Sequence, residues 1–329
     1  MISVGFLGCA HVHADHYLTE LSDPALDAQV VAVFDRDAEK GRKFALAAEL
    51  TFVATPDDLC AIVDAAIIAG EHVYYPELVA SAATAGVPVL CEKPLGISAA
   101  AAAAILGSGA WLSVAFPVRY AHPVGEAKAM IESGHLGRLL AMSGVNRADF
   151  PGRFFGTKAM AGGGAIIDHV VHLVDALSWL TGCEYDTVYA ESSDLFKVRD
   201  VEDAARVIIT TRDGAWVSID PSWSRPPGMA GANDFVMTLW FEHGEMMIDA
   251  FARHGTRIET GGRLSHVPYG VGMNAAMLAD WLRAIRSGAP PPIPARDGWR
   301  ATELALAALA SAKSGDVIKL GATTGGVQS

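Results

Sequence analysis

The sequence is poor in cysteine, in positive charge and in long apolar runs, and each shortage excludes a class of protein. Its 329 residues include only four cysteines, whose positions show neither paired nor metal-type spacing: Cys9, Cys60, Cys91 and Cys183. We therefore expect reduced thiols. Only 25 Lys and Arg residues face 37 Asp and Glu residues, so the net charge is -12. This balance disfavours a nucleic-acid partner, because binding a phosphodiester backbone needs clustered basic residues.

Targeting and membrane-spanning segments are also missing from the pattern. No stretch approaches the roughly 20 uninterrupted apolar residues of a membrane helix. The first residues lack the basic region and the long apolar region of a signal peptide. We expect a cytoplasmic globular protein without a membrane partner. The chain is long enough for two domains or one large barrel, and its hydrophobic residues, 51% of the total, can bury a sizeable core.

Short apolar runs in the first third of the chain alternate with helical patterns. This alternation is typical of a parallel sheet covered by helices on both faces. We predict helices at residues 39–50 and 76–85, the second closed by Gly86. The predicted strands are residues 3–7, 30–34, 65–69, 87–91 and 111–116.

The rest of the chain has longer runs of alternating polarity, which predict an open, mostly antiparallel sheet. Asp213-Gly214 and His243-Gly244 stand between adjacent runs and predict two-residue turns with positive φ. The predicted strands are residues 139–146, 187–191, 206–211, 215–219, 236–241 and 245–249. Helices are expected near 124–133, at 275–286 and at 298–314, and a flexible tail at 321–329.

The first predicted strand ends in a turn that partly matches a dinucleotide-binding motif, G-x-G-x-x-G. Only its first glycine is retained, and His13 stands in the third place. Asp35 ends the second strand, where a carboxylate can accept both ribose hydroxyls and favours NAD. Arg36 could hold a 2'-phosphate, so NADP stays open, as does a merely solvated turn. The candidate cofactor-binding residues here are Gly8, Cys9, Ala10, His11, Val12, Asp35 and Arg36.

The histidines at positions 11, 13 and 16 allow a second interpretation. An H-x-H after a first strand also begins some metal-dependent hydrolase barrels, and imidazole is a common zinc ligand. Such a site needs ligands at later strand ends, whereas Asp168 and His172 are expected on a helix. The antiparallel second half does not suit a barrel either. We therefore expect no metal and interpret His11, His13 and His16 as polar loop residues or cofactor contacts.

The fourth predicted strand ends in Glu92-Lys93-Pro94, which places a lysine at the carboxyl edge of the sheet. Open α/β sheets bind their ligands at this edge. A lysine there can donate a hydrogen bond to a substrate hydroxyl and favour its deprotonation.

A glycine-rich stretch, Gly162–Gly164, opens an apolar helix that contains a few ionisable residues. Asp168, His172 and Asp175 stand at i, i+4 and i+7 and are expected on one face, with His169 about 100° away. Buried ionisable groups are costly unless they are paired or face a polar cleft. The helix therefore predicts either an active-site face or an Asp–His pair inside the core.

These features together resemble the Gfo/Idh/MocA oxidoreductases, named for glucose–fructose oxidoreductase and inositol dehydrogenase. The matching segments are Gly8, Asp35, AGVPVLCEKPLG, GGGAIIDHVVHLVD and the closing helices. The resemblance implies an α/β Rossmann domain at 1–118 and an α+β domain with an open antiparallel sheet at 119–320. It also implies a homodimer or homotetramer that acts on sugars, inositols or related polyols. The catalytic residues carried over are Lys93, Asp168 and His172, with Glu92 and Pro94 on the cofactor side.

The chain departs from the family pattern at two strand ends. Gly70-Glu71-His72 replaces a Thr-Pro-Asn, and Phe116-Pro117-Val118-Arg119 keeps the arginine of its motif without the polar residue. We predict Gly70, His72 and Arg119 as further cofactor contacts. The predicted substrate-binding residues are Lys93, Arg119, Tyr120, Asp168, His169 and His172, and weaker candidates are His122, Arg147, Trp223 and Asn233.

The function expected from this resemblance is hydride transfer between a nicotinamide and a hydroxyl-bearing carbon. His172 would take the hydroxyl proton, Asp168 would orient the imidazole, and Lys93 would stabilise the developing alkoxide. Three alternatives stay open: a redox-assisted lyase or glycosidase of the same family, a non-catalytic dinucleotide-binding protein, and a metal-dependent hydrolase using His11 and His13.

Overall fold

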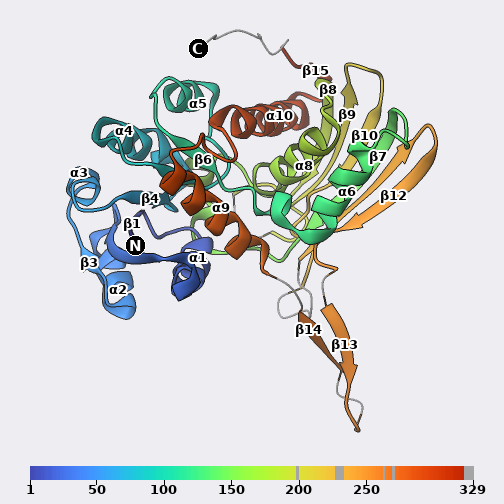
Figure 1. Cartoon of the computed structure of the whole chain (residues 1–329). Coiled ribbons are helices and arrows are strands. Elements are labelled where there is room, and N and C mark those ends of the chain that lie inside the picture. Colours follow the sequence, from blue (N-terminus) through green and yellow to red (C-terminus); the bar gives the residue numbers. More distant parts are fainter. Residues whose placement is uncertain (198–199, 227–232, 253, 262–263, 269–270, 322–329) are drawn as a thin grey trace.

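The computed structural model describes residues 1–321 except 198–199, 227–232, 253, 262–263 and 269–270. Two sheets lie side by side and are linked by helices, with a two-stranded arm projecting below them (Figure 1). The flexible tail predicted at 321–329 lies, from residue 322 onward, outside the described residues.

The first sheet has six parallel strands in the order β3-β2-β1-β4-β5-β6. Their buried apolar residues explain the parallel arrangement, because both faces are covered by helices. The order reverses between β1 and β4, and this switch point is where such sheets bind ligands. The strands are β1 (Ile2–Leu7), β2 (Ala28–Phe34), β3 (Thr51–Phe52), β4 (Ala65–Ile68), β5 (Val89–Cys91) and β6 (Leu112–Val114).

The helices around this sheet begin and end where the sequence supplies caps. Asp37 accepts hydrogen bonds from the main-chain N–H groups of Glu39 and Lys40 at the start of α2. Gly86 ends α4 with φ +69°, as predicted. The helices are α1 (His13–Leu21), α2 (Ala38–Ala48), α3 (Pro56–Cys60), α4 (Tyr75–Ala85) and α5 (Ala99–Leu106), with 3-10 turns η1 (Pro24–Leu26), η2 (His72–Tyr74) and η3 (Pro117–Tyr120).

The second sheet is mixed and has seven strands in the order β12-β11-β7-β10-β9-β8-β15. Only the β10–β7 pair is parallel, so the predicted fold class is confirmed. The strands are β7 (Leu139–Arg147), β8 (Tyr185–Ser193), β9 (Ala204–Thr211), β10 (Trp216–Asp220), β11 (Asp234–Phe241), β12 (Gly244–Asp249) and β15 (Ile318–Lys319). The arm consists of β13 (His254–Ile258) and β14 (Leu264–Pro268).

Both predicted turns differ from the prediction. Gly214 has the expected positive φ, +90°, but Thr211 donates its main-chain N–H to Ala215 O, so the turn has three residues instead of two. Phe241 pairs with Gly244, so the loop between β11 and β12 consists of Glu242 and His243, neither of which has positive φ. The Glu242 side chain joins this loop to the start of β7, because it accepts the main-chain N–H of Arg138 at 3.0 Å.

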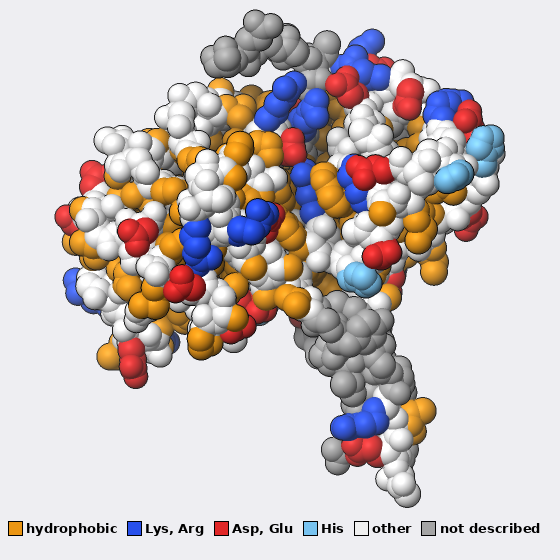
Figure 2. All heavy atoms as spheres, in the orientation of Figure 1, with side chains coloured by type: hydrophobic (Ala, Val, Ile, Leu, Met, Phe, Trp, Pro, Cys, Tyr) orange, Lys and Arg blue, Asp and Glu red, His pale blue; other side chains and the backbone are white. Residues whose placement is uncertain are grey.

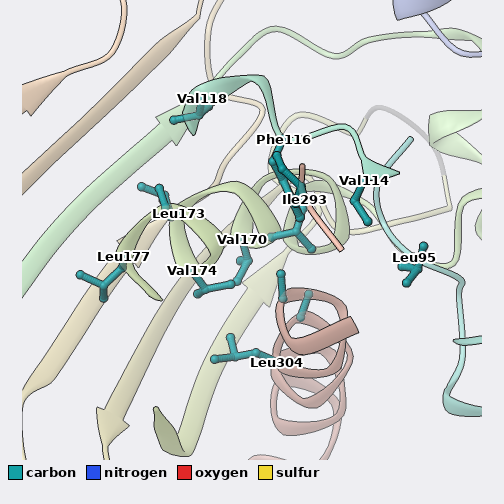
Figure 3. Packing of buried hydrophobic residues seen from close by; sticks show 14 of the residues in the cluster. Leu95, Val114, Phe116, Val118, Val170, Leu173, Val174, Leu177, Ile293 and Leu304 are labelled. Carbon is teal, nitrogen blue, oxygen red and sulfur yellow. The ribbon is translucent and has the colours of Figure 1, made fainter. Parts of the chain in front are cut away.

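The helices of the second part are α6 (His122–Glu132), α7 (Lys158–Ala161), α8 (Val171–Thr181) and α10 (Ala295–Ser314), with a 3-10 turn η4 (Arg153–Gly156) and a π-helical turn η5 (Ile166–Val170). In Figure 3, Val170 of η5 and Val174 of α8 lie on the side of the helix toward Leu304 of α10. Leu173 and Leu177 belong to the same buried cluster. The stretch Lys158–Thr181 is long and apolar enough to cross a membrane by composition, but 83% of its most apolar window is buried inside the protein. It is accounted for as a core helix.

The helix α9 (Met273–Ser287) leaves the second sheet and packs against α1. Its fully buried Trp281 and Leu282 share a core with Val4 and Tyr17 near the N-terminus. The proposed boundary at 118 stays a prediction, because the core of the first sheet also contains residues from the end of the chain.

Candidate active site

The turn after β1 brings two glycines into contact at the switch point. Gly8 has φ +88° and donates its main-chain N–H to Phe34 O at 2.7 Å. A Cβ added at Gly8 would lie 2.5 Å from the Cα of Gly70, at the end of β4. Only glycine fits here, both for its conformation and for its space. The retained first glycine of the motif is thus required by the geometry of the turn.

Asp35 ties the end of β2 to this turn. Its Oδ2 accepts the main-chain N–H of Cys9 at 2.8 Å, and its Oδ1 accepts that of Asp37 at 2.9 Å. Asp35 also borders a cleft of about 300 Å³ that Arg36, Phe52 and Glu77 help to line. Arg36 pairs with Glu77 and lies 4.2 Å from the centre of the Tyr74 ring. A carboxylate beside an open cleft at the end of β2 suits the ribose of a dinucleotide.

Arg153 covers the same turn from the second part of the chain, a contact that the sequence did not predict. Its Nη1 donates to His11 O at 2.9 Å, and its Nη2 pairs with Asp15 at 2.6 Å. The neighbouring Phe154 and Phe155 pack against the rings of His11 and His72. The two parts of the chain therefore meet at the turn.

The predicted histidine pair converges on Glu92 of the strand-end motif. The Nδ1 of His13 lies 2.8 Å from Oε1 of Glu92, which also accepts a hydrogen bond from Tyr17. Burial would raise the pKa of Glu92, but the nearby His11 and His13 outweigh it and hold the pKa well below its usual range. Glu92 is thus a buried anion surrounded by donors.

His11, His13 and Glu92 could also hold a metal, because their ligating atoms lie within 4.8 Å of one another. The hydrogen bonds favour another interpretation. Nδ1 of His11 accepts the main-chain N–H of His13 at 3.1 Å, so the proton of the neutral ring is on Nε2. This protonated nitrogen faces Glu92 Oε2 at 3.7 Å. A protonated nitrogen cannot ligate a metal, although at this distance Nε2 forms no hydrogen bond with Glu92 either.

A cavity of about 480 Å³ opens beside this cluster, between the carboxyl edge of the first sheet and the second sheet. The cavity brings together the predicted strand-end lysine, Lys93, and three ionisable residues of the predicted helix, Asp168, His169 and His172. Its polar lining residues are His11, His13, His16, Lys93, Asn146, Asp149, Asp168, His169, His172, Asn233 and Asn274.

Lys93 and Asp168 form a buried ion pair in this pocket. The Nζ of Lys93 donates to Oδ1 of Asp168 at 2.6 Å and to its main-chain oxygen at 3.2 Å. An ammonium group has three protons, so one remains for a ligand. Burial alone would raise the pKa of Asp168, but Lys93 and His169 hold it well below its usual range.

The second oxygen of Asp168 is held by residues of the second part. Oδ2 accepts a hydrogen bond from Trp223 Nε1 at 3.1 Å and lies 3.2 Å from His169 Nε2. His169 in turn contacts Pro221 O through Nδ1 at 2.7 Å. The carboxylate is thus fixed from both sides, and its oxygens have little basicity left.

His172 lines the pocket one helical turn after Asp168. Its Nδ1 is buried and has no hydrogen-bond partner among the described residues, so Nε2 is the nitrogen available to the cavity. Burial, followed by the charge of Lys93, holds the pKa of His172 well below its usual value. The imidazole is therefore neutral near pH 7 and presents a nitrogen with a free lone pair or proton to the cavity.

Asp175 does not share the pocket face, in contrast to the prediction. It pairs with Arg119 at 2.6 Å, and Arg119 also contacts Asp297 at 2.9 Å. The π-helical turn before α8 explains the difference, because its residues advance by less than the 100° assumed for an α-helix. Burial raises the pKa of Asp175 to about 6 in spite of Arg119.

Two residues predicted to bind the substrate, Arg119 and Tyr120, lie outside the pocket. The guanidinium of Arg119 is engaged in its pairs with Asp175 and Asp297, away from both the pocket and the turn at Gly8. Tyr120 donates its hydroxyl to Asp280 of α9 at 2.8 Å. Both residues therefore link helices, and neither lines the cavity.

Several lining residues were missed from the sequence. Asn146 and Asp149 lie at and just after the end of β7, and Asn274 lies at the start of α9. A polar residue at a strand end was the available signal for Asn146. Nothing in the sequence pattern joined Asn274 to the turn at Gly8, because the two are brought together only by the return of α9.

The residues present fit a dinucleotide: a glycine turn that a Cβ would fill, a carboxylate ending β2, and a donor-lined pocket at the switch point. Fold and site together define an oxidoreductase of the Rossmann type with a second, sheet-bearing part. Residues 2–111 match the family model for the oxidoreductase family with an NAD-binding Rossmann fold, and residues 124–247 match the GFO/IDH/MocA C-terminal domain. The chain belongs to the GFO/IDH/MocA family and has its NAD-binding domain.

Known proteins agree with this assignment. Inositol 2-dehydrogenase 2 of Saccharopolyspora erythraea is 30% identical over 233 residues, covering 67% of this chain and 66% of that protein. GenD2 from gentamicin A biosynthesis, solved with NAD, has a TM-score of 0.83 at 24% identity and covers 98% of this chain and 97% of its own. The myo-inositol 2-dehydrogenase of Lactobacillus plantarum has a TM-score of 0.82 at 19% identity, with 97% and 99% covered.

Proposed function

We propose that this protein transfers a hydride between NAD and a hydroxyl-bearing carbon of a sugar, an inositol or a related polyol. The observation that carries the proposal is the Lys93–Asp168 ion pair beside the neutral His172, in a pocket at the carboxyl edge of the first sheet. The relative from Saccharopolyspora erythraea, an inositol 2-dehydrogenase, supports the substrate class.

The side chains divide the work according to their partners. His172 accepts the proton of the substrate hydroxyl at Nε2, since burial keeps its ring neutral. Lys93 donates its remaining N–H to the oxygen on which negative charge develops. NAD supplies the acceptor for the hydride. Asp168 acts as an anchor for Lys93, because its oxygens are already engaged by donors.

The cofactor end favours NAD over NADP. Asp35 places a carboxylate beside the cleft, where it accepts ribose hydroxyls and repels a 2'-phosphate. Arg36 could balance such a phosphate, but its charge is engaged by Glu77 and the Tyr74 ring.

A coupled assay tests the proposal. NAD and NADP are offered with sugars, inositols and glycosides, and nicotinamide absorbance is followed for the protein and for Lys93→Met, with Lys313→Met as an exposed control. We expect turnover with a polyol and NAD, lowered about 10²-fold or more in Lys93→Met, while NAD binding stays largely intact. Unchanged turnover in Lys93→Met would remove the lysine from the scheme.

A redox-assisted lyase or glycosidase of the same family is the alternative. It would consume a glycoside without net NADH release and keep its cofactor through purification, which the same assay detects. A metal-dependent hydrolase using His11 and His13 would contain a bound metal ion after purification. Metal analysis of the purified protein therefore distinguishes it from the dehydrogenase and from the lyase or glycosidase. The cytoplasmic location and the homodimer or homotetramer stay predictions from the sequence.

A further inference from the structure

Asp149 is a pocket carboxylate without a counter-ion in the described structure. It follows β7, is half-buried, and lines the cavity beside Phe150 and Pro151. In the described part of the chain, no side chain or main-chain group forms a hydrogen bond or an ion pair with it. A carboxylate partly removed from water among apolar side chains is stabilised by a cation or by strong donors.

The positive charges near this carboxylate are already engaged. Lys93 is the one Lys or Arg among the described lining residues, and its charge is paired with Asp168 at 2.6 Å. Arg147, just before Asp149 in the chain, pairs with Asp234 at 2.7 Å, and Arg225 pairs with the same carboxylate. The described pocket therefore offers no unpaired Lys or Arg to an anionic substrate.

The histidines of the pocket do not replace the missing cation. Burial lowers the pKa of both His11 and His172, so neither is charged near pH 7. His13 contacts Glu92, and His169 lies between Asp168 and Pro221 O, so each faces a partner of its own. His16 is exposed at the mouth.

Neutral amides supply the remaining polar lining. Asn146 donates its side-chain N–H to His169 O at 3.3 Å, which leaves its oxygen free to accept. Oδ1 of Asn274 is buried and has no partner among the described residues. Asn233 lines the same cavity. An amide both donates and accepts hydrogen bonds, as a hydroxyl does. An unpaired carboxylate and a free amide oxygen only accept, which suits a ligand group that only donates.

We propose that the pocket selects a polyol or sugar that carries a protonated amino group, held by Asp149 and by amide oxygens such as that of Asn274. This inference rests on the proposed function. At the reacting carbon the C–H passes as hydride to NAD⁺ and the hydroxyl proton passes to His172, which leaves a carbonyl. The ammonium group is recognised and keeps its bonds. Uronic acids and sugar phosphates are disfavoured by Asp149.

Matched ligands test this selection. Inositol is compared with its monoamino derivatives at each ring position, and glucose with glucosamine and glucuronate, by kcat/KM with NAD. A charge-assisted hydrogen bond predicts that at least one amino derivative exceeds its parent about tenfold or more. In Asp149→Asn this ratio should fall toward one. Asp194→Asn, an exposed change of the same chemistry, should keep the ratio.

Binding separates this inference from the proposed function. Dissociation constants of the same ligands are measured by calorimetry in the presence of NADH, so that the answer does not require turnover. Tighter binding of an amino derivative that Asp149→Asn abolishes supports the selection even where no hydride transfer occurs. If every amino derivative binds no better than its parent, or the preference persists in Asp149→Asn, the inference is overturned.

Discussion

The indole nitrogen of Trp223 lies 3.1 Å from Oδ2 of Asp168 and donates a hydrogen bond to it. The tryptophan belongs to the second sheet region and is buried, whereas the aspartate opens the central helix. Because Lys93 holds the other oxygen of Asp168, the indole fixes the orientation of the pair on which the lysine depends.

Replacing Trp223 by Phe removes this donor and loosens Lys93. We expect kcat to fall about tenfold or more, since a hydrogen bond to a charged group contributes about 1.5–3 kcal/mol. The dissociation constant for NAD should not change. Trp240→Phe is a matched control, because Trp240 donates to Glu245 at 2.8 Å on the exposed sheet. A kcat equal to that of the control would show that the indole does not position the pair.

Substitution of Gly8 and of Gly86 by alanine distinguishes the cost of backbone strain from the cost of a steric clash. Both have positive φ, but a Cβ at Gly86 meets nothing within 4 Å, whereas one at Gly8 would collide with Gly70. Gly86→Ala should lower the free energy of unfolding by about 1 kcal/mol and Gly8→Ala by about 3–5 kcal/mol, measured by urea denaturation. Equal losses would mean that the turn relaxes around the methyl group.

Acid should destabilise the protein partly through His72. Burial lowers the pKa of His72 from 6.5 to about 4. Since the unfolded chain binds this proton more readily, the histidine contributes stability above pH 6.5 that is lost as the pH falls toward 4. The loss is up to about 3 kcal/mol.

His72→Gln should therefore show a smaller drop in the free energy of unfolding between pH 7 and pH 4.5 than the unchanged protein. His135→Gln, an exposed substitution, serves as the control and should keep the full drop. Parallel curves for His72→Gln and the unchanged protein would contradict the assignment.

Asp35→Asn tests the cofactor preference. The amide keeps an acceptor for the main-chain N–H of Cys9 but removes the charge that repels a 2'-phosphate. We expect the ratio of kcat/KM for NAD over NADP to fall about tenfold or more. Glu39→Gln, an exposed change on α2, should leave the ratio unaltered, and an unaltered ratio in Asp35→Asn would assign the discrimination to other groups.

Much of this site could be predicted because its residues stand at strand ends or on one helix. Lys93 follows β5, and the apolar helix isolates Asp168 and His172. Both signals are local, since strand polarity and helix periodicity need no knowledge of the tertiary fold. The likeness to a known family then joined the two segments.

The remaining residues depended on packing that local patterns do not encode. Arg119 has the chemistry of a ligand-binding group, but its partners Asp175 and Asp297 come from two other helices. The π-helical turn displaced Asp175 from the predicted face. Asp149 and Asn274 reach the pocket only through the placement of the second sheet and the return of α9.

The packing of α9 against the N-terminal core also has a consequence for folding during synthesis. Trp281 and Leu282 complete the apolar core around β1, although more than 250 residues separate them from it. A nascent chain that has released the whole parallel sheet still lacks these two core residues. We therefore expect the cofactor-binding half to complete its core only after Trp281 and Leu282 have left the ribosome.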